Sequence, residues 1–197
     1  MKKRNNFKTI VNFLYEVGTA RNIVRGHRQV LQNANDTIAS HSFRVAIIGL
    51  ILAELEQVNT DKVVKMCLLH DLAELRTGDA NFLNKYYRVE NEEKAIDDQW
   101  KEIVGGKKAI SLLKEYNERK SKESQVAKDA DNLEQIFLQK EYLPENSYDL
   151  KRWHRHIEEK LETKSAFKIA KLVFKTRPID WVYEFSDSIE HHKKKIK

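Results

Sequence analysis

The scarcity of glycine and proline is the feature of this sequence that most restricts its fold. The 197 residues include six glycines and two prolines. Tight turns between β-strands depend on these residues, so we do not expect this chain to form a sheet with many hairpins. Long helices joined by few tight turns suit it better. We therefore predict an all-α protein with a single compact helical fold, since a chain of this length can bury a core without disulfides or structural metals.

Apolar residues recur at helical spacing along most of the chain. This periodicity predicts helices near residues 5–18, 40–57, 60–75, 90–103, 107–117, 122–142, 147–162, 164–175 and 178–194. Two longer segments, 19–39 and 76–89, lack the pattern and are predicted to be irregular. Long irregular segments in compact helical domains are often functional.

Cysteine content and apolar run length exclude several classes of protein. The single cysteine, Cys67, rules out a disulfide framework and a cysteine-based zinc site, and it favours a reducing compartment. No continuous run of about 18 apolar residues occurs, so we expect no membrane partner. The basic N-terminus is not followed by an apolar segment, so we expect no signal peptide and a cytoplasmic protein.

The net charge of +6 is concentrated at the two ends of the chain. The basic residues there are Lys2, Lys3 and Arg4, and Lys193, Lys194, Lys195 and Lys197. We interpret them as solvated termini, so nucleic acid is not an expected partner. A basic cleft for a phosphorylated small molecule would leave the same excess of charge, and composition does not separate the two.

Three predicted helices each place a possible metal ligand on or beside an apolar face. His41 shares a helical stripe with Val45, Ile48, Leu52 and Leu55. His70, followed by Asp71, shares one with Val63, Met66 and Cys67. Asp131 lies at the edge of a face formed by Val126, Ala130, Leu133 and Phe137.

Taken singly, each of these residues has an ordinary explanation as a hydrogen-bonded core histidine or a boundary carboxylate. The combination is harder to explain, because burying a carboxylate costs several kcal/mol unless it is paired or metal-bound. Imidazole and carboxylate groups together suit Mn, Fe, Co, Ni or Zn. We therefore predict one divalent transition metal ion held by His41, His70, Asp71 and Asp131.

Glu74 has the spacing of a general acid or base for such a site. It follows His70 by four residues and Asp71 by three, so on a continuous helix it faces the same way. It could hold a water on the metal without being a ligand, which is the position that acid–base catalysis needs. Gly78 and Asp79 follow in a loop that could reach back over the site.

These residues carry a resemblance to a known family. The stretches HSFRVAIIGLILA, LLHDLAELRTGD and KDADNLEQIFLQKEY, with an opening FLYEVG followed by Arg25, resemble the HD-domain metal-dependent phosphohydrolases, in particular the 5'-deoxynucleotidase subgroup. The resemblance covers roughly residues 7–145. An isolated His-Asp pair is a weak motif. Here the HDxxE sequence, the TGD that follows, the upstream histidine and the downstream KDAD make a specific pattern.

The resemblance implies a role for each matching position. His41, His70, Asp71 and Asp131 would be the metal ligands, and Glu74 would activate or orient the attacking water. Asp79 would lie near the substrate sugar and the leaving oxygen, and Arg25 would bind the phosphate. Asp36 stands where the family usually has glutamate. The pair Lys85 and Tyr86 resembles a pair of substrate-contacting residues in bacterial members.

Two positions depart from the family pattern. The tryptophan that usually follows the arginine is absent, since Gly26, His27 and Arg28 occupy that segment, and Ser40 replaces the usual glutamate before His41. Both changes lie in the substrate-contacting segment and not among the metal ligands. They leave hydrolysis as the expected chemistry and leave base and sugar preference open.

The resemblance predicts an HD phosphohydrolase core at residues 1–145 and a homodimer. The segment 146–197 carries no family motif but is amphipathic, so we predict that it is a C-terminal helical extension packed on the core. The resemblance also predicts hydrolysis of deoxynucleoside 5'-monophosphates to deoxynucleoside and inorganic phosphate. Alternatives are a deoxynucleoside triphosphohydrolase or a hydrolase of another small nucleotide. From a different class, the chain could be a non-catalytic nucleotide- or nucleic-acid-binding module, or a purely structural helical protein. His27 and His154 could supply a further ligand, but we expect both on the surface.

Overall fold

The computed structural model describes residues 6–31, 34–89, 91–145 and 147–195, with the side chains of 187 and 190–195 outside the description. Its elements are α1 (Phe7–Gly18), the short 3-10 helices η1 (Thr19–Asn22) and η2 (Gly26–Gln29), α2 (Ile38–Glu56), α3 (Thr60–Leu69), α4 (Glu74–Thr77), α5 (Phe82–Tyr87), α6 (Glu92–Trp100), α7 (Gly106–Glu118), α8 (Lys122–Tyr142), α9 (Tyr148–Glu158), α10 (Lys164–Lys175) and α11 (Asp180–Lys195). Within these residues the extended structure is one isolated bridge, Val24 to Thr37. The all-α prediction is confirmed.

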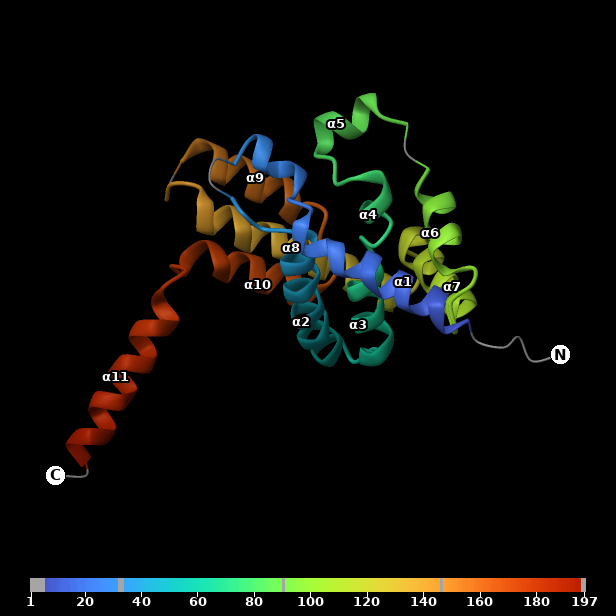
Figure 1. Cartoon of the computed structure of the whole chain (residues 1–197). Helices are drawn as coiled ribbons and strands as arrows, with labels where there is room; N and C mark the ends of the chain where they lie inside the picture. Colours follow the sequence, from blue (N-terminus) through green and yellow to red (C-terminus); the bar gives the residue numbers. More distant parts are fainter. Residues whose placement is uncertain (1–5, 32–33, 90, 146, 196–197) are drawn as a thin grey trace.

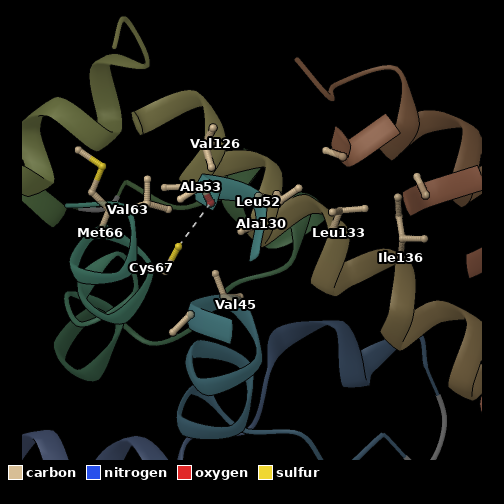
Figure 2. Close-up of a cluster of buried hydrophobic side chains, with 14 of the residues drawn as sticks. Val45, Leu52, Ala53, Val63, Met66, Cys67, Val126, Ala130, Leu133 and Ile136 are labelled. Atoms are coloured by element: carbon tan, nitrogen blue, oxygen red, sulfur yellow. Dashed lines mark hydrogen bonds between the residues drawn. The ribbon is translucent and has the colours of Figure 1, made fainter. Parts of the chain in front are cut away.

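Helices α2, α3 and α8 pack together at the centre of the molecule (Figure 1). Their facing residues form the main core, which includes Val45, Leu52, Val63, Met66, Val126, Ala130 and Leu133 (Figure 2). Gly49 lets α2 and α3 approach closely, because a Cβ there would lie 2.5 Å from the Cys67 sulfur. This three-helix contact brings together the elements that carry the predicted metal ligands.

Helix α2 is long and apolar enough to cross a membrane by length and composition alone. In the structure it is the central core helix, since it packs against α3 and α8 and buries Ile38, His41, Val45 and Leu52. Core helices of soluble proteins have the same composition, so the apolar content of α2 is weak evidence for a membrane-spanning helix. The expectation of no membrane partner stays a prediction.

The C-terminal helices differ in how they contact the rest of the chain. Helices α9 and α10 lie against α8, and α10 also contacts α2. Helix α11 extends away from the other helices (Figure 1), with Trp181 and Phe185 70% and 64% exposed. The division of the chain near residue 145 stays a prediction. The side chains of the basic residues at both ends lie outside the described residues.

Three expectations about local structure are wrong. The helix predicted at 60–75 ends at Leu69, and a turn at residues 70–73 separates it from α4. The segment 76–89 contains α5, which begins after Asn81, whose side chain accepts the backbone N–H groups of Leu83 and Asn84. Leu55 is 57% exposed, because it lies in the last turn of α2 at the edge of the buried stripe.

Candidate active site

His41 is held at the beginning of α2 by the cap of that helix. The Thr37 hydroxyl accepts the Ser40 backbone N–H, and the Ser40 hydroxyl accepts the Thr37 N–H in return, which forms a capping box. The His41 ring is fully buried, and its Nε2 faces the predicted ligands of two other helices. Nε2 lies 3.3 Å from His70 Nε2, 3.4 Å from Asp71 Oδ2 and 3.2 Å from Asp131 Oδ1.

The break between α3 and α4 positions His70 and Asp71. The Nδ1 of His70 donates to the Cys67 carbonyl at 2.8 Å, and this carbonyl would accept the Asp71 N–H in an uninterrupted helix. The chain then turns through tighter bonds, such as the Glu74 N–H to the Asp71 carbonyl. Because a carbonyl only accepts, Nδ1 carries the hydrogen, and Nε2 of His70 faces Asp71 Oδ1 at 3.2 Å.

Asp131 reaches the same point from the middle of α8. Its Oδ1 lies 3.2 Å from His41 Nε2 and 3.8 Å from His70 Nε2. Its other oxygen, Oδ2, accepts from Lys128 at 2.7 Å and from the Tyr116 hydroxyl at 3.4 Å. One oxygen therefore faces the two histidines and the other is paired.

Three of the four predicted ligands, His41, His70 and Asp71, lie close enough together to hold a single metal ion, and Asp131 Oδ1 lies beside the two histidines. Donor atoms that each lie about 2.1 Å from one ion are separated from one another by about 3 to 4.2 Å. The distances between the donor atoms above lie in this range, and ligand atoms of His41, His70 and Asp71 fall within 4.8 Å of one another. Neutral imidazoles and carboxylates are also the donors that divalent transition metals accept.

Arg25 and Glu74 lie beside these four residues. Arg25 is 8% exposed, and its Nη1 lies 2.6 Å from Asp71 Oδ2 and 3.8 Å from Glu74 Oε2. Lys85 approaches Glu74 from α5, with Nζ 3.6 Å from Oε1. Glu74 is buried, and its Oε2 has no hydrogen-bond partner among the described residues. This carboxyl group is thus placed next to the cluster with an oxygen available for a further partner.

Asp79 closes the cluster on the side of Arg25. Its Oδ2 lies 3.1 Å from Arg25 Nε and accepts the Gly26 backbone N–H at 3.0 Å. A side chain at Gly26 would not fit, since a Cβ there would lie 2.7 Å from the Asn81 backbone nitrogen. The segment after Arg25, where the family usually has a tryptophan, thus has a glycine at the point where its backbone approaches that of Asn81.

The profile of the HD domain family matches residues 17–172. The chain belongs to the HD domain family. The match begins before Arg25 and ends within α10, so it includes every predicted site residue of this HD-domain protein and extends past the boundary expected near residue 145.

Similar proteins of this family are found among named enzymes and solved structures. The chain is 28% identical to the 5'-deoxynucleotidase HDDC2 of Dictyostelium discoideum over 144 residues, which are 67% of this chain and 72% of that protein. It is 26% identical to the 5'-deoxynucleotidase HDDC2 of Homo sapiens over 143 residues, 68% of this chain and 69% of that protein. The crystal structure of PH0347 from Pyrococcus horikoshii OT3 is similar with a TM-score of 0.69 and 28% identity, covering 84% of this chain and 98% of that one.

The electrostatics of the HD-domain cluster divide its carboxyl groups into two kinds. Burial opposes the ionisation of Asp71 and Asp131, yet the pKa of each lies well below the ordinary range. For Asp71 the groups that lower the pKa are His70, His41 and Arg25. For Asp131 they are Lys128 and the same two histidines. For Glu74, burial and then the charges of Asp71 and Asp79 raise the pKa to about 9. Without a metal, Glu74 is therefore protonated at neutral pH.

The pKa of His41 is raised well above its ordinary value. Burial and the charge of Arg25 lower it, but hydrogen bonds to Asp131, Asp71 and Glu134 outweigh them. A metal ion must displace the proton on Nε2, so metal binding at this site should release protons and weaken at low pH.

We expect the metal-free protein to lose stability as the pH rises from about 5 to about 9. The pKa of Glu74 is about 9 in the folded protein and 4.5 ordinarily. Between these values the folded state binds more protons than the unfolded state, so the free energy of unfolding falls as the pH rises. The raised pKa of His41 acts in the same direction. Asp71 and Asp131 lose their contribution only at acid pH. The test is to measure urea midpoints across this pH range with a chelator present. The midpoint should fall less steeply with rising pH for Glu74→Gln than for the wild type. The same dependence on pH in both proteins would contradict the assignment to Glu74.

Some of the other candidate residues lie away from the cluster. Tyr86 is 82% exposed, with its ring edge-on to Tyr87. The Asp36 carboxylate accepts from His27 Nε2 at 2.9 Å, while the Asp36 backbone carbonyl accepts the Arg25 N–H. Asp36 thus lies beside the segment of Arg25, and its side chain does not join the predicted metal ligands.

The two histidines expected on the surface are largely buried. His27 is paired with Asp36, and its side chain is 11% exposed. His154 is 7% exposed, with its ring against Phe174 and its Nε2 3.6 Å from Glu158. Each is paired with residues other than the predicted ligands, so neither joins them.

Sequence reasoning missed several residues that support the cluster. They are Arg44, Tyr116, Lys128 and Glu134. The signal available for two of them was helical spacing, since Lys128 and Glu134 lie three residues before and after Asp131. Tyr116 comes from α7, and no local pattern connects it to the site.

Proposed function

We propose that this protein is a metal-dependent phosphohydrolase that converts deoxynucleoside 5'-monophosphates to deoxynucleosides and inorganic phosphate. The observation that supports the proposal is the close approach of His70, Asp71 and Asp131, from two other regions of an HD-domain chain, to the buried ring of His41. The relatives named 5'-deoxynucleotidase support the choice of substrate class.

We assign the metal to His41 Nε2, His70 Nε2 and the carboxylates of Asp71 and Asp131. When bound, a divalent ion would act as a Lewis acid toward water and the phosphoryl oxygens. Glu74 would orient the attacking water and take its proton, because its carboxyl lies next to the cluster with one oxygen unpartnered among the described residues. The positive charge of a bound ion would favour the ionised form that this role requires.

Arg25 is proposed to neutralise the substrate phosphate. Its present contacts with Asp71, Glu74 and Asp79 use Nε and Nη1, so Nη2 is the nitrogen that we expect to meet a phosphate oxygen. Asp79 pairs with the guanidinium, and we expect it to lie near the substrate sugar and the leaving oxygen. Lys85, half exposed beside Glu74, is proposed to add a second positive charge for the substrate phosphate. Asp36 and Tyr86 stay predictions as substrate contacts.

A phosphate-release screen tests the proposal. Nucleoside mono- and triphosphates, in ribo and deoxy forms, would be supplied with Mn, Co, Mg, Zn or no metal. We expect inorganic phosphate from dAMP or dTMP, only with a transition metal. Tripolyphosphate from deoxynucleoside triphosphates would instead indicate a triphosphohydrolase. Binding of nucleotides without turnover would indicate a non-catalytic module.

We also propose a homodimer in the cytoplasm. The outward face of α2 exposes apolar residues at helical spacing, which include Phe43, Ile47, Leu50 and Ile51. Burying this face between two copies would remove it from water. We expect light scattering to give twice the chain mass of 23.2 kDa, and Ile47→Glu to give the monomer mass. A monomeric wild-type protein would contradict the proposal.

A further inference from the structure

We propose that Glu134 is a positioning residue for the metal site, which holds the His41 imidazole in the tautomer and orientation that direct Nε2 to the ion. The inference rests on the proposed function, because it presupposes that His41 is a metal ligand. It adds a residue that does not touch the metal or the substrate.

The geometry at His41 assigns a different partner to each ring nitrogen. Nε2 faces the other predicted ligands, and Nδ1 lies 2.7 Å from Glu134 Oε2. An ionised carboxylate has no hydrogen to donate, so Nδ1 must carry the hydrogen of this bond. In the neutral ring this leaves the lone pair on Nε2, which is the atom that a metal needs.

Helical spacing explains how one crossing of two helices builds this arrangement. Asp131 and Glu134 are three residues apart on α8, so they project from adjacent turns of the same face. His41 and Arg44 have the same spacing on α2. Helix α8 therefore provides two residues to the site. Asp131 would bind the metal directly, and Glu134 would act on it indirectly by holding the His41 ring.

Arg44 keeps the Glu134 carboxylate charged and fixed. Glu134 is 2% exposed, and a buried carboxylate without a partner would be strongly destabilising. Arg44 donates to Glu134 Oε1 from Nη2 at 2.7 Å and from Nε at 3.1 Å, which leaves Oε2 for His41. Arg44 Nη1 also donates to Glu141 at 2.6 Å, toward the exposed end of α8.

A purely structural ion pair would require only the contacts between Arg44 and Glu134. The bond from His41 Nδ1 uses the second oxygen of the same carboxylate and connects this pair to the predicted ligand set. Carboxylates in this position orient a ligating histidine and raise its basicity, and their removal typically lowers metal affinity or activity about 10- to 100-fold.

The test is the affinity for Mn²⁺ or Zn²⁺ of Glu134→Gln, measured by titration against a competing chelator. We expect the dissociation constant to rise about 10- to 100-fold, with the far-ultraviolet circular dichroism unchanged. The matched control is Glu141→Gln, which removes the other carboxylate on Arg44 and does not contact His41. We expect it to bind metal like the wild type. Equal affinities for the two variants would overturn the assignment.

Nitrogen-15 spectra of histidines in the Zn²⁺-loaded protein provide a second readout that does not depend on a variant. We expect the His41 ring to carry its hydrogen on Nδ1, with a strongly hydrogen-bonded proton signal. A His41 ring protonated on Nε2 and bound through Nδ1 would overturn the proposal, even if Glu134→Gln fails to fold. A wild-type protein that binds no metal would instead overturn the proposed function itself.

Discussion

Replacing Glu74 with glutamine is expected to lower kcat about 10²- to 10⁴-fold while metal affinity stays within a few-fold of the wild type. The carboxyl lies beside the four predicted ligands and is the group that we propose takes the proton from water. Glutamine keeps its size but accepts no proton. Because the metal-free protein already holds Glu74 in its neutral form, with a pKa of about 9, the substitution should not disturb the fold.

The measurement is phosphate release from dAMP by the Mn²⁺-loaded variant, with metal content determined on the same sample. Glu93→Gln is the matched control, because this glutamate is exposed in the first turn of α6 and should retain the wild-type rate. Activity of Glu74→Gln near the wild-type level, with metal bound, would show that another group activates the water.

Replacing Arg25 with methionine should destabilise the metal-free protein by about 3–5 kcal/mol at neutral pH, which is the usual effect of removing one partner from a buried ion pair. Arg25 is 8% exposed and is the cation closest to Asp71 and Asp79. Methionine keeps much of the apolar stem, so the loss reports mainly on charge. A bound divalent ion would supply part of the missing positive charge, and we therefore expect a smaller loss in the metal-loaded protein.

Urea unfolding with a chelator present, and again with excess Mn²⁺, measures this difference. The matched control is Arg76→Met, which breaks a more exposed ion pair with Glu16 and should cost about 1 kcal/mol or less. If Arg25→Met and Arg76→Met were equally mild without metal, Arg25 would not be the group that balances the buried carboxylates.

The positions of the predicted ligands were the part of the candidate site most accessible from the sequence. His41 and His70 lie on apolar helical stripes, and Asp131 lies beside one, so periodicity alone placed them near one core. The residues that matter through distant contacts were not accessible in this way. Tyr116 on α7 touches Asp131 on α8, and Arg25 reaches Asp71 across 46 positions of sequence. Local patterns do not encode such pairs.

The helix break at His70 shows how side chains predicted to be ligands can come together although the predicted local structure is wrong. Periodicity continued the helix to residue 75, because the apolar pattern includes Leu72 and Leu75. The side-chain bond from His70 to the Cys67 carbonyl competes with that pattern and turns the chain. The same turn directs Asp71 toward His41 and places Glu74 beside the cluster. The hydrogen bond between the His70 side chain and the Cys67 backbone therefore helps to set the directions of Asp71 and Glu74, which helical periodicity does not encode.

The most direct test of the account is the anomalous scattering of a crystal grown with Mn²⁺ or Zn²⁺. We expect one metal peak about 2.0–2.3 Å from Nε2 of His41, Nε2 of His70 and a carboxylate oxygen each of Asp71 and Asp131. A map with no peak at this point, or with the ion held by other residues, would contradict the proposed metal centre and the hydrolase function that depends on it.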